Sequence, residues 1–491
     1  MKARGSILVG LLWCLALLSI VVVGALHSAR LDLMVVKNHG DLMQAHYLAL
    51  AGIERAKALL YQDAVTRRKS HKNYSGELAN APEYFKDIRL GRGEYRVFHQ
   101  GDREDSERIL FGVTDEESRL NVNYASIQEL GKLYEMPPEV AAEIADYRDE
   151  DETVSPNGAE AGDYAALRPP YLPRNAPFQT TRELLMVLKL PRELLVGEDA
   201  NQNGMLDPEE DDGDESFPPD NRDGYLDAGW SGVITVDSSV QNVNAAGEDR
   251  VNVKSADENA LLKVQGITAP IARAIVSYRG QNQLDSLADL LDVTAAPPQS
   301  QAGPQSQAPP VQSQQQTPPV QGQPQAQPNA PGQGRGPVQQ NVTVNQNPAQ
   351  PAPGRPAGPP GPKMIDENLL MEIADDITVG DDKEQAGAVN INTASLPVLI
   401  CLPGINEQLA QALITYRRAN GFFSNIAGLL KVPGMTREIF KQLAGRITAR
   451  SETFRILSEG KVSSSGARKR IQAIVHVTSS RIDTLSYRED L

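Results

Sequence analysis

The pattern of hydrophobic and polar positions begins with an apolar run from Ile7 to about Leu26, which the basic residues Lys2 and Arg4 precede. A run of roughly twenty uncharged residues is long enough to span a bilayer as a helix. From Arg30 to about Gln62, apolar residues return at helical spacing and no proline interrupts them. The pattern therefore predicts one helix of roughly fifty residues that continues from a membrane span into a soluble domain.

The residues before this helix indicate how the chain is oriented and processed. Lys2 and Arg4 favour a cytoplasmic N-terminus. A cleaved secretory signal is the alternative, but the apolar run is long for one and no small-x-small site closes it. A short basic leader ending in Gly5, then Ser6, then an unbroken apolar helix resembles the N-terminus of a type IV prepilin.

That resemblance implies that a prepilin peptidase cuts after Gly5 and leaves Ser6 as the first mature residue, and it also implies methylation. Most members of the family carry glutamate as the fifth mature residue, where this chain has Gly10. The minor pseudopilins of type K resemble this chain in lacking the glutamate. The departure is consistent with a subunit that has no neighbour above it.

Short alternating segments predict strands at both ends of the soluble region. Two of them, 94–99 and 108–113, follow the helix, and two more, 454–457 and 470–477, flank a predicted hairpin turn at Ser463–Gly466. We therefore predict an α+β fold with a long N-terminal helix and an antiparallel pilin-like sheet. Roughly residues 117–450 are inserted into this domain as a large all-α insertion.

The insertion contains three copies of one helical pattern, which resembles the helix-hairpin-helix unit. Each copy begins with Asn-x-x-x-Ala and reaches a Tyr-Arg pair at the same spacing. Gly266 and Gly404 form the predicted hairpin turns of copies two and three, and Glu135 stands at this position in copy one. The starts of the copies are Asn121–Ala125, Asn252–Ala256 and Asn390–Ala394, and the pairs are Tyr147-Arg148, Tyr278-Arg279 and Tyr416-Arg417.

Units of this kind often bind DNA by directing hairpin amides at a phosphate. In this chain Thr268 and Asn406 replace the second hairpin glycine. The whole chain is acidic, with 63 Asp and Glu against 48 Lys and Arg, whereas residues 388–450 hold seven Lys and Arg against two Glu. A phosphate contact stays open for copy three. We favour a protein-binding scaffold, and nucleic acid is not the expected partner.

The clearest chemical motif is an EF-hand-like calcium loop at residues 199–210. It places oxygen-bearing side chains at loop positions one, three, five and nine, Gly204 at position six and a glutamate at position twelve. Leu206 is expected to tie the loop to the core. The predicted ligands are Asp199, Asn201, Asn203, Met205 through its carbonyl oxygen, Asp207 and Glu210. Calcium is the only cofactor that the sequence predicts, and we expect its role to be structural.

Residues 220–227 copy the middle of that loop and supply the weaker candidate ligands Asp220, Asp223 and Asp227. Pro219 and Trp230 stand at the first and twelfth positions of this second loop, where ligands would be expected. The segment is either a degenerate second calcium site or a source of further ligands for the first site, together with Asp211, Asp212 or Asp214.

The remaining composition argues against catalysis. The chain has six histidines and two cysteines, Cys14 and Cys401, so neither a histidine-based metal centre nor a disulfide framework is predicted. We find no nucleophile motif and no phosphate-binding loop, and we therefore expect no enzyme. Residues 296–363 are rich in Pro and Gln and predict a disordered linker between copies two and three.

These features give an expected layout along the chain. The predicted segments are a leader (1–5), the transmembrane part of the helix (6–28), a pilin-like helix and first strands (29–116), an α-domain with copies one and two and the calcium loop (117–295), the linker (296–363), copy three (364–450) and the returning strands (451–491).

This order of features resembles general secretion pathway protein K over nearly the whole chain outside the linker. The resemblance implies a non-catalytic minor pseudopilin at the tip of a type II secretion pseudopilus, which assists pseudopilus assembly and protein export across the outer membrane. It implies a single-pass inner-membrane protein with most of the chain in the periplasm. The implied partners are minor pseudopilins of types I and J, inner-membrane components of the secretion system and the prepilin peptidase.

The alternative is a membrane-anchored helix-hairpin-helix DNA receptor of the competence type. It predicts an uncut N-terminus and salt-sensitive DNA binding through copy three. The additional sheet and the calcium loop favour the pseudopilin.

Overall fold

The computed structural model describes residues 4–74, 76–101, 107–213, 215, 220–295 and 362–489, and it describes side chains from Ile7 onward. Residues 1–3 of the predicted leader and nearly all of the predicted linker lie outside this described part. The same holds for Asp214, for Pro219 and for residues 102–106.

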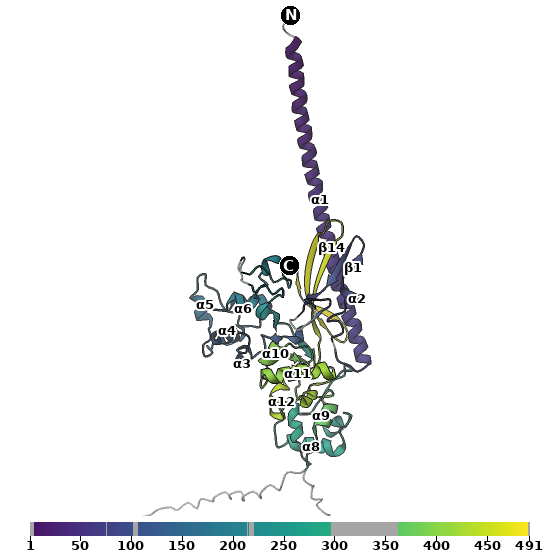
Figure 1. Cartoon of the computed structure of the whole chain (residues 1–491). Helices are drawn as coiled ribbons and strands as arrows, with labels where there is room; N and C mark the ends of the chain where they lie inside the picture. Colours follow the sequence, from purple (N-terminus) through teal and green to yellow (C-terminus); the bar gives the residue numbers. More distant parts are fainter. Residues whose placement is uncertain are drawn as a thin grey trace, which may run out of the picture. The chain divides into compact units, whose positions relative to one another are not determined.

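Helix α1 runs from Arg4 to Lys69 without a proline, so it is longer than the sequence pattern predicts (Figure 1). Its large apolar side chains from Ile7 to Val36 are exposed. A window of 18 residues has a mean hydropathy of 2.8, and none of it is buried. By length and composition this helix can cross a membrane. Three basic residues in its last turn interact favourably with the helix dipole.

The second half of α1 packs on the sheet through a ridge of small and branched residues. The contact is close, because a Cβ added at Gly460 would lie 2.1 Å from the carbonyl oxygen of Ala45, and one at Gly52 would lie 2.2 Å from Ser458 Oγ. Glycine on both surfaces thus lets the helix and strand β14 approach each other. The buried ridge consists of Ala45, Leu48, Ala49, Ile53, Ala56, Leu60 and Ala64.

The main sheet is antiparallel, in the order β1-β2-β14-β15-β16, and β5 also pairs with β14. This confirms the predicted long helix and antiparallel sheet. Its strands are β1 (Ile88–Leu90), β2 (Gly93–Val97), β5 (Thr114–Asp115), β14 (Thr453–Val462), β15 (Arg468–Val477) and β16 (Ile482–Arg488). A short helix, α2 (Pro82–Phe85), precedes β1, and a small ladder joins β3 (His99–Gln100) to β4 (Ile109–Leu110).

The insertion leaves and re-enters the sheet at neighbouring positions. β5 precedes it and β14 follows it, and Phe454 pairs with Asp115. The two ends of the insertion are therefore adjacent, so a large insertion disturbs the sheet little.

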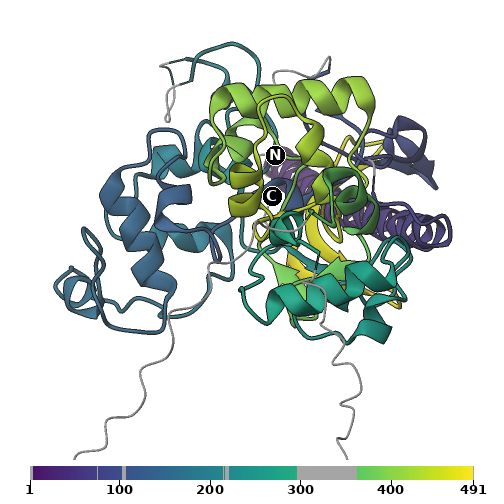
Figure 2. The ribbon, with the colours of Figure 1, turned by 90° about the horizontal axis from the view of Figure 1, so that it is seen from below.

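Three copies with one element order make up the insertion (Figures 1 and 2). Each copy has a two-residue strand, two helices, a 3₁₀ helix, a third helix and a closing strand parallel to the first. Copy one (120–235) comprises β6 (Leu120–Asn121), α3 (Ile127–Leu130), α4 (Pro138–Arg148), η2 (Thr181–Met186), α6 (Arg192–Val196) and β7 (Ile234–Thr235). Copy two (251–378) comprises β9 (Val251–Asn252), α7 (Glu258–Leu261), α8 (Ala269–Arg279), η5 (Leu287–Asp292), α9 (Glu367–Ile373) and β10 (Ile377–Thr378). Copy three (389–448) comprises β12 (Val389–Asn390), α10 (Leu396–Cys401), α11 (Glu407–Asn420), η6 (Ile426–Lys431), α12 (Arg437–Leu443) and β13 (Ile447–Thr448).

Shorter elements lie in the excursions, the additional segments between the elements of a copy, and in the connections between copies. They are η1 (Glu116–Ser118), α5 (Ala161–Ala165), η3 (Pro208–Glu210), η4 (Gly229–Gly232) and the antiparallel pair β8 (Ser239–Gln241) and β11 (Glu384–Ala386).

Two expectations about the insertion differ from the structure. The insertion is not all-α, because each copy is closed by a parallel ladder that fixes its first and last residues. The expected start of copy three at residue 364 is wrong, because α9 and β10 complete copy two and β10 pairs with β9. The predicted linker therefore interrupts copy two, between η5 and α9, and does not separate copies two and three.

Candidate functional site

The repeated asparagine and arginine have the same structural use in each copy. In copy three, Asn390 Oδ1 accepts a hydrogen bond from the amide of Asn392 at 2.9 Å, and Arg417 Nη1 donates to the carbonyl of Ile391 at 2.9 Å. Asn121 and Asn252 bind the amide two residues onward in the same way. Arg148 and Arg279 likewise donate to carbonyl oxygens near the start of their copies. These repeated residues therefore close the fold of each copy.

The predicted hairpin turns adopt the expected backbone. Gly266 and Gly404 have φ angles of +91° and +73°, a region that favours glycine, and Glu135 adopts φ of +49° at the corresponding place in copy one. In copy three, Asn406 caps the following helix by accepting from the Leu409 amide at 2.9 Å. A side chain of the protein thus already occupies an amide at which a phosphate could bind.

A second hairpin in the same copies was missed by the sequence analysis. It connects the 3₁₀ helix to the last helix, and Gly434 in copy three has φ of +91°. In copy one Lys189 stands there with φ of +57°. The signal in the sequence was the segment Val432–Thr436, which repeats the Pro-Gly turn of the first hairpin.

Three basic residues of copy three pair with carboxylates of the other copies. Arg446 forms a two-pronged ion pair with Glu129 of copy one, with distances of 3.0 and 3.1 Å. Arg437 Nη2 lies 3.0 Å from Glu367 of copy two, and Lys441 pairs with Asp289 of the same copy. Part of the local basic excess thus serves contacts between copies, which favours the scaffold interpretation over a phosphate-binding surface.

The predicted calcium loop follows helix α6 of copy one and is closely turned. Gly204 has φ of +71°, as position six of such a loop requires. The Asp199 carboxylate accepts from the amides of Asn203 at 2.9 Å and Gly204 at 3.1 Å. The side-chain amides of Asn201 and Asn203 donate to Asp207 Oδ2 at 3.0 and 2.7 Å. The loop thereby brings four of the predicted ligands together.

Glu210 completes this group from the short helix η3. One of its oxygens accepts from the Asp207 amide at 3.1 Å, whereas the other is buried and has no hydrogen-bond partner. Burial raises the pKa of Asp199 to about 6 and that of Glu210 to about 7. Buried carboxylates with an unsatisfied oxygen are a suitable donor set for a hard cation.

The loop lies against the pilin-like sheet. The side chain of Met205 packs against the hydrophobic core of α1 and the sheet, and a Cβ at Gly204 would lie 3.4 Å from Leu457 of β14. Arg488 of β16 donates to the carbonyl of Gln202 at 2.9 Å. Leu206, the expected anchor, and Met205 are both half-buried, and it is Met205 that packs against this core. The loop therefore connects copy one to the sheet.

The second acidic loop is organised by backbone amides. Asp220 accepts from the amides of Asp212 and Gly213 at 2.8 and 2.6 Å, and Asp227 accepts from Gly229 at 2.9 Å. Asp223 accepts from the Tyr225 amide at 2.8 Å. These three aspartates do not converge on one point in the described part of the chain.

Two further residues, Trp230 and Glu198, belong to the surroundings of the second loop. Trp230, at the twelfth loop position, is buried in the core of copy one and donates to the Tyr134 carbonyl at 2.8 Å. Glu198, which the sequence analysis missed, links the two loops by accepting from the amides of Asn221 at 3.2 Å and Asp227 at 3.1 Å.

Three consecutive acidic residues, Asp115, Glu116 and Glu117, lie buried where the sheet meets the copies. Asp115 accepts from Ser451 Oγ at 2.6 Å, and Glu116 pairs with Arg455 at 2.7 Å. Glu117 accepts from the amides of Thr453 and Ser239. Burial, and then the charge of Asp115, raise the pKa of Glu117 well above its ordinary value.

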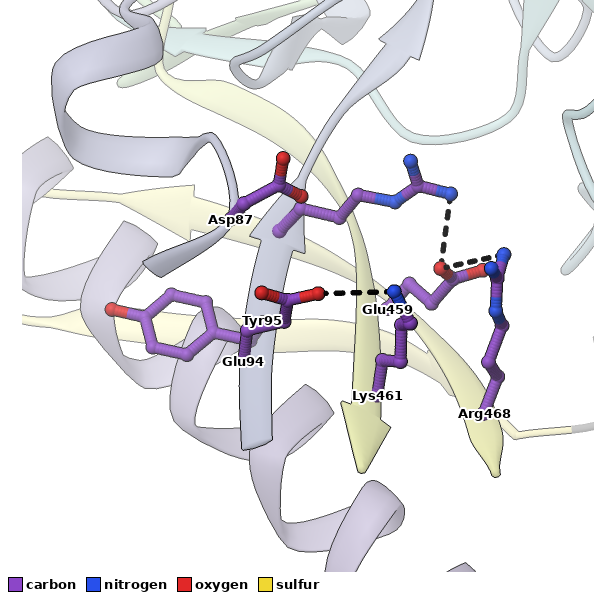
Figure 3. Close-up of a pocket in the computed structure, with 7 residues that line it drawn as sticks. Asp87, Glu94, Tyr95, Glu459, Lys461 and Arg468 are labelled. Carbon is purple, nitrogen blue, oxygen red and sulfur yellow. Dashed lines mark hydrogen bonds and ion pairs between the residues drawn. The ribbon is translucent and has the colours of Figure 1, made fainter. Parts of the chain in front are cut away.

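A shallow pocket on the sheet is lined by charged residues of β2, β14 and β15 (Figure 3). Lys461 lies 3.2 Å from Glu94, and Glu459 pairs with Arg96 at 2.9 Å and with Arg470 at 2.9 Å. These charges compensate one another, and the arrangement does not favour a small-molecule site.

Comparisons with known proteins identify two segments of the chain. Residues 113–196 match the family model described as type II secretion system protein K, and residues 384–448 match that of the helix-hairpin-helix motif. The chain therefore carries a protein K domain, which confirms the resemblance found in the sequence. The match begins next to β5, where the insertion leaves the sheet.

Several curated relatives match short parts of the chain, which spans only part of their length. Transcriptional accessory protein Tex of Neisseria gonorrhoeae is 43% identical over 81 residues, which are 16% of this chain and 10% of that protein. ComE operon protein 1 of Bacillus subtilis is 36% identical over 73 residues, which are 15% of this chain and 36% of that protein. Among solved structures, the GspK-GspI-GspJ complex of the enterotoxigenic Escherichia coli type 2 secretion system matches with 12% identity and a TM-score of 0.41, covering 91% of this chain and 97% of the matched chain.

Proposed function

We propose that this chain, which carries a type II secretion system protein K domain, is a non-catalytic minor pseudopilin that assists pseudopilus assembly and protein export. The observation that carries the proposal is the architecture around β5 and β14. A long apolar helix packs on an antiparallel sheet, and the protein K segment departs from that sheet between two paired strands.

The helix supports a role in assembly. Its side chains from Ile7 to Val36 are exposed over many turns, and exposed apolar surface of this extent requires a membrane or a partner. We propose that it anchors the chain once in the inner membrane and packs against minor pseudopilins of types I and J. The bulk of the chain would lie in the periplasm, and the prepilin peptidase and inner-membrane components of the secretion system would be further partners.

Site-directed cross-linking tests these contacts. In a Cys14→Ser background, Val36→Cys places a thiol on an exposed helix position, and Ser480→Cys places one on an exposed loop between β15 and β16. We expect the helix variant to cross-link to pseudopilins of type I or J in cells and the loop control to form no such product. Equal cross-linking at both positions would contradict packing through the helix.

We further propose that the 199–210 loop binds calcium through Asp199, Asn201, Asn203, the Met205 carbonyl, Asp207 and Glu210. The ion would offset the repulsion between the carboxylates of Asp199, Asp207 and Glu210. Because the loop also contacts β14 and β16, the ion would strengthen the connection between copy one and the sheet. The loop containing Asp220, Asp223 and Asp227 is a weaker second candidate for calcium.

A membrane-anchored DNA receptor is the second candidate, because ComE operon protein 1 and Tex share similarity with part of this chain. Fluorescence anisotropy with duplex DNA across a salt series separates the two proposals. A receptor would bind with an affinity that falls steeply with salt, and Arg418→Ala and Lys431→Ala in copy three would weaken binding. The pseudopilin proposal predicts no salt-sensitive binding that depends on copy three.

A further inference from the structure

A second group of acidic side chains converges in copy one, away from both loops described above. Asp146 lies in the last turn of α4, Asp149 caps that helix, and Glu160 precedes α5. One carboxylate oxygen from each lies within 4.8 Å of the other two. Among the described residues, no other group of three His, Cys, Asp or Glu side chains comes this close together.

Asp146 and Glu160 are buried and Asp149 is half-buried, and several of their oxygens have no hydrogen-bond donor. The exposed fraction of Asp146 is 0% and that of Glu160 is 4%. One oxygen of Asp146, one of Asp149 and both of Glu160 have no hydrogen-bond partner. The second oxygen of Asp146 accepts from the Ser155 amide at 3.1 Å. A buried ionised carboxylate that lacks both donors and a counterion is strongly unfavourable.

The surrounding charges add to the imbalance. Burial and the carboxylates of Asp146 and Asp149, followed by Glu152 and Asp151, raise the pKa of Glu160 to about 7. The neighbouring Arg148 donates to the carbonyl of Ala125, and its charge acts on Asp149, where it partly offsets the rise in pKa. The protein therefore places negative charge here without placing a matching positive charge beside Glu160.

The other two copies show that the helical unit itself does not require this group. At the position of Asp146, copies two and three carry Ser277 and Thr415. Glu160 belongs to an excursion between α4 and η2 that neither of the other copies has. The three carboxylates occur together only in copy one, where the excursion folds back onto the end of α4.

We propose that Asp146, Asp149 and Glu160 form a binding site for a hard divalent cation such as calcium, separate from the 199–210 loop. Carboxylates are ligands that hard cations prefer. The three oxygens lie within 4.8 Å of one another, close enough for one ion to contact all three, and calcium with ligand distances of about 2.3–2.6 Å can do so. The inference does not depend on the proposed secretion function.

Counting bound calcium on the full-length chain in detergent tests the site. Equilibrium dialysis at pH 7, followed by elemental analysis, is compared for the wild type, Glu160→Gln, Glu210→Gln and the double variant. We expect Glu160→Gln to lose one calcium ion per chain and the double variant to lose one more than Glu210→Gln. Glu139→Gln, an exposed position on the same helix α4, is the matched control and should bind as many ions as the wild type.

A thermal melt gives an independent readout. Without calcium, Glu160→Gln should be at least as stable as the wild type, because it removes repulsion. With calcium, its rise in melting temperature should be smaller than that of the wild type. Asp149→Asn, at the less buried position, gives the same comparison if Glu160→Gln does not fold.

One result would overturn the proposal. An unchanged calcium count together with an unchanged calcium-dependent rise in the melting temperature of Glu160→Gln would show that protons shared among the carboxylates, and no cation, hold the group together.

Discussion

Copies one and three share an order of elements and differ in what is added to it. Copy three closes between β12 and β13 without an excursion. Copy one has one excursion after α4 and another after α6, before β7 completes it. Both acidic loops lie in these excursions, and the acidic group joins Glu160 of the first excursion to Asp146 and Asp149 at the end of α4. The comparison shows that the helical unit supplies the packing and that the oxygen-rich chemistry of copy one depends on the added segments.

The largest expected effect tests whether the copies fold as one unit. Phe440 on α12 and Leu195 on α6 are corresponding core residues with exposed fractions of 0%. Phe440→Ala should lower the free energy of unfolding by about 3–5 kcal/mol and Leu195→Ala by about 2–5 kcal/mol. One hydrophobic core includes residues of all three copies, so each variant should shift a single transition in chemical denaturation. Two separate transitions would show that the copies are independent.

Calcium removal should distinguish the two copies. An ion at a hundred times its dissociation constant stabilises the folded state by about 2.7 kcal/mol. Chelation should therefore increase hydrogen exchange in residues 198–229 of copy one and leave residues 389–448 of copy three unchanged. Glu210→Gln should show the increased exchange with or without chelator. Uniform change in both copies, or no change in either, contradicts calcium at the loop.

The contact between copies one and three should be measurable as a coupling energy. Arg446 and Glu129 form a two-pronged ion pair in which Glu129 is 5% exposed. A double-mutant cycle with Arg446→Met and Glu129→Gln should give a coupling of about 0.5–3 kcal/mol in unfolding experiments. Arg446→Lys is the matched control, since it keeps the charge and loses the forked geometry. Additive effects would show that this pair does not connect the copies.

The smallest expected effect concerns the pH dependence at the junction with the sheet. The pKa of Glu117 is raised well above its ordinary value, so the folded protein holds a proton that the unfolded chain releases above about pH 4.5. Stability should therefore fall as the pH rises from about 4.5 toward the folded pKa. Glu117→Gln, which stays neutral, should reduce this fall in denaturation measured across the pH range. An unchanged pH profile would show that Glu117 is ionised in the folded protein.

Much of the architecture could be predicted from local pattern, because the helix, the strand alternation and the Asn and Tyr-Arg repeats are local signals. The closing strands were not predictable, since Ile377 and Thr378 form a strand only by pairing with β9, more than a hundred residues earlier. That pairing also decides which copy contains the predicted linker.

The candidate metal ligands likewise differ in whether the local sequence predicts them. The 199–210 loop has a fixed spacing that can be read directly. Asp146, Asp149 and Glu160 have no motif, and only folding of the excursion onto α4 brings them together. The packing of Met205 on the sheet depends on the same kind of long-range contact.

The mass of the mature N-terminal peptide, from cells with and without prepilin peptidase, tests the central claim most directly. The pseudopilin account predicts a peptide that begins at Ser6 only when the peptidase is present. An intact start at Met1 or Lys2 in both strains would contradict it and favour the anchored receptor.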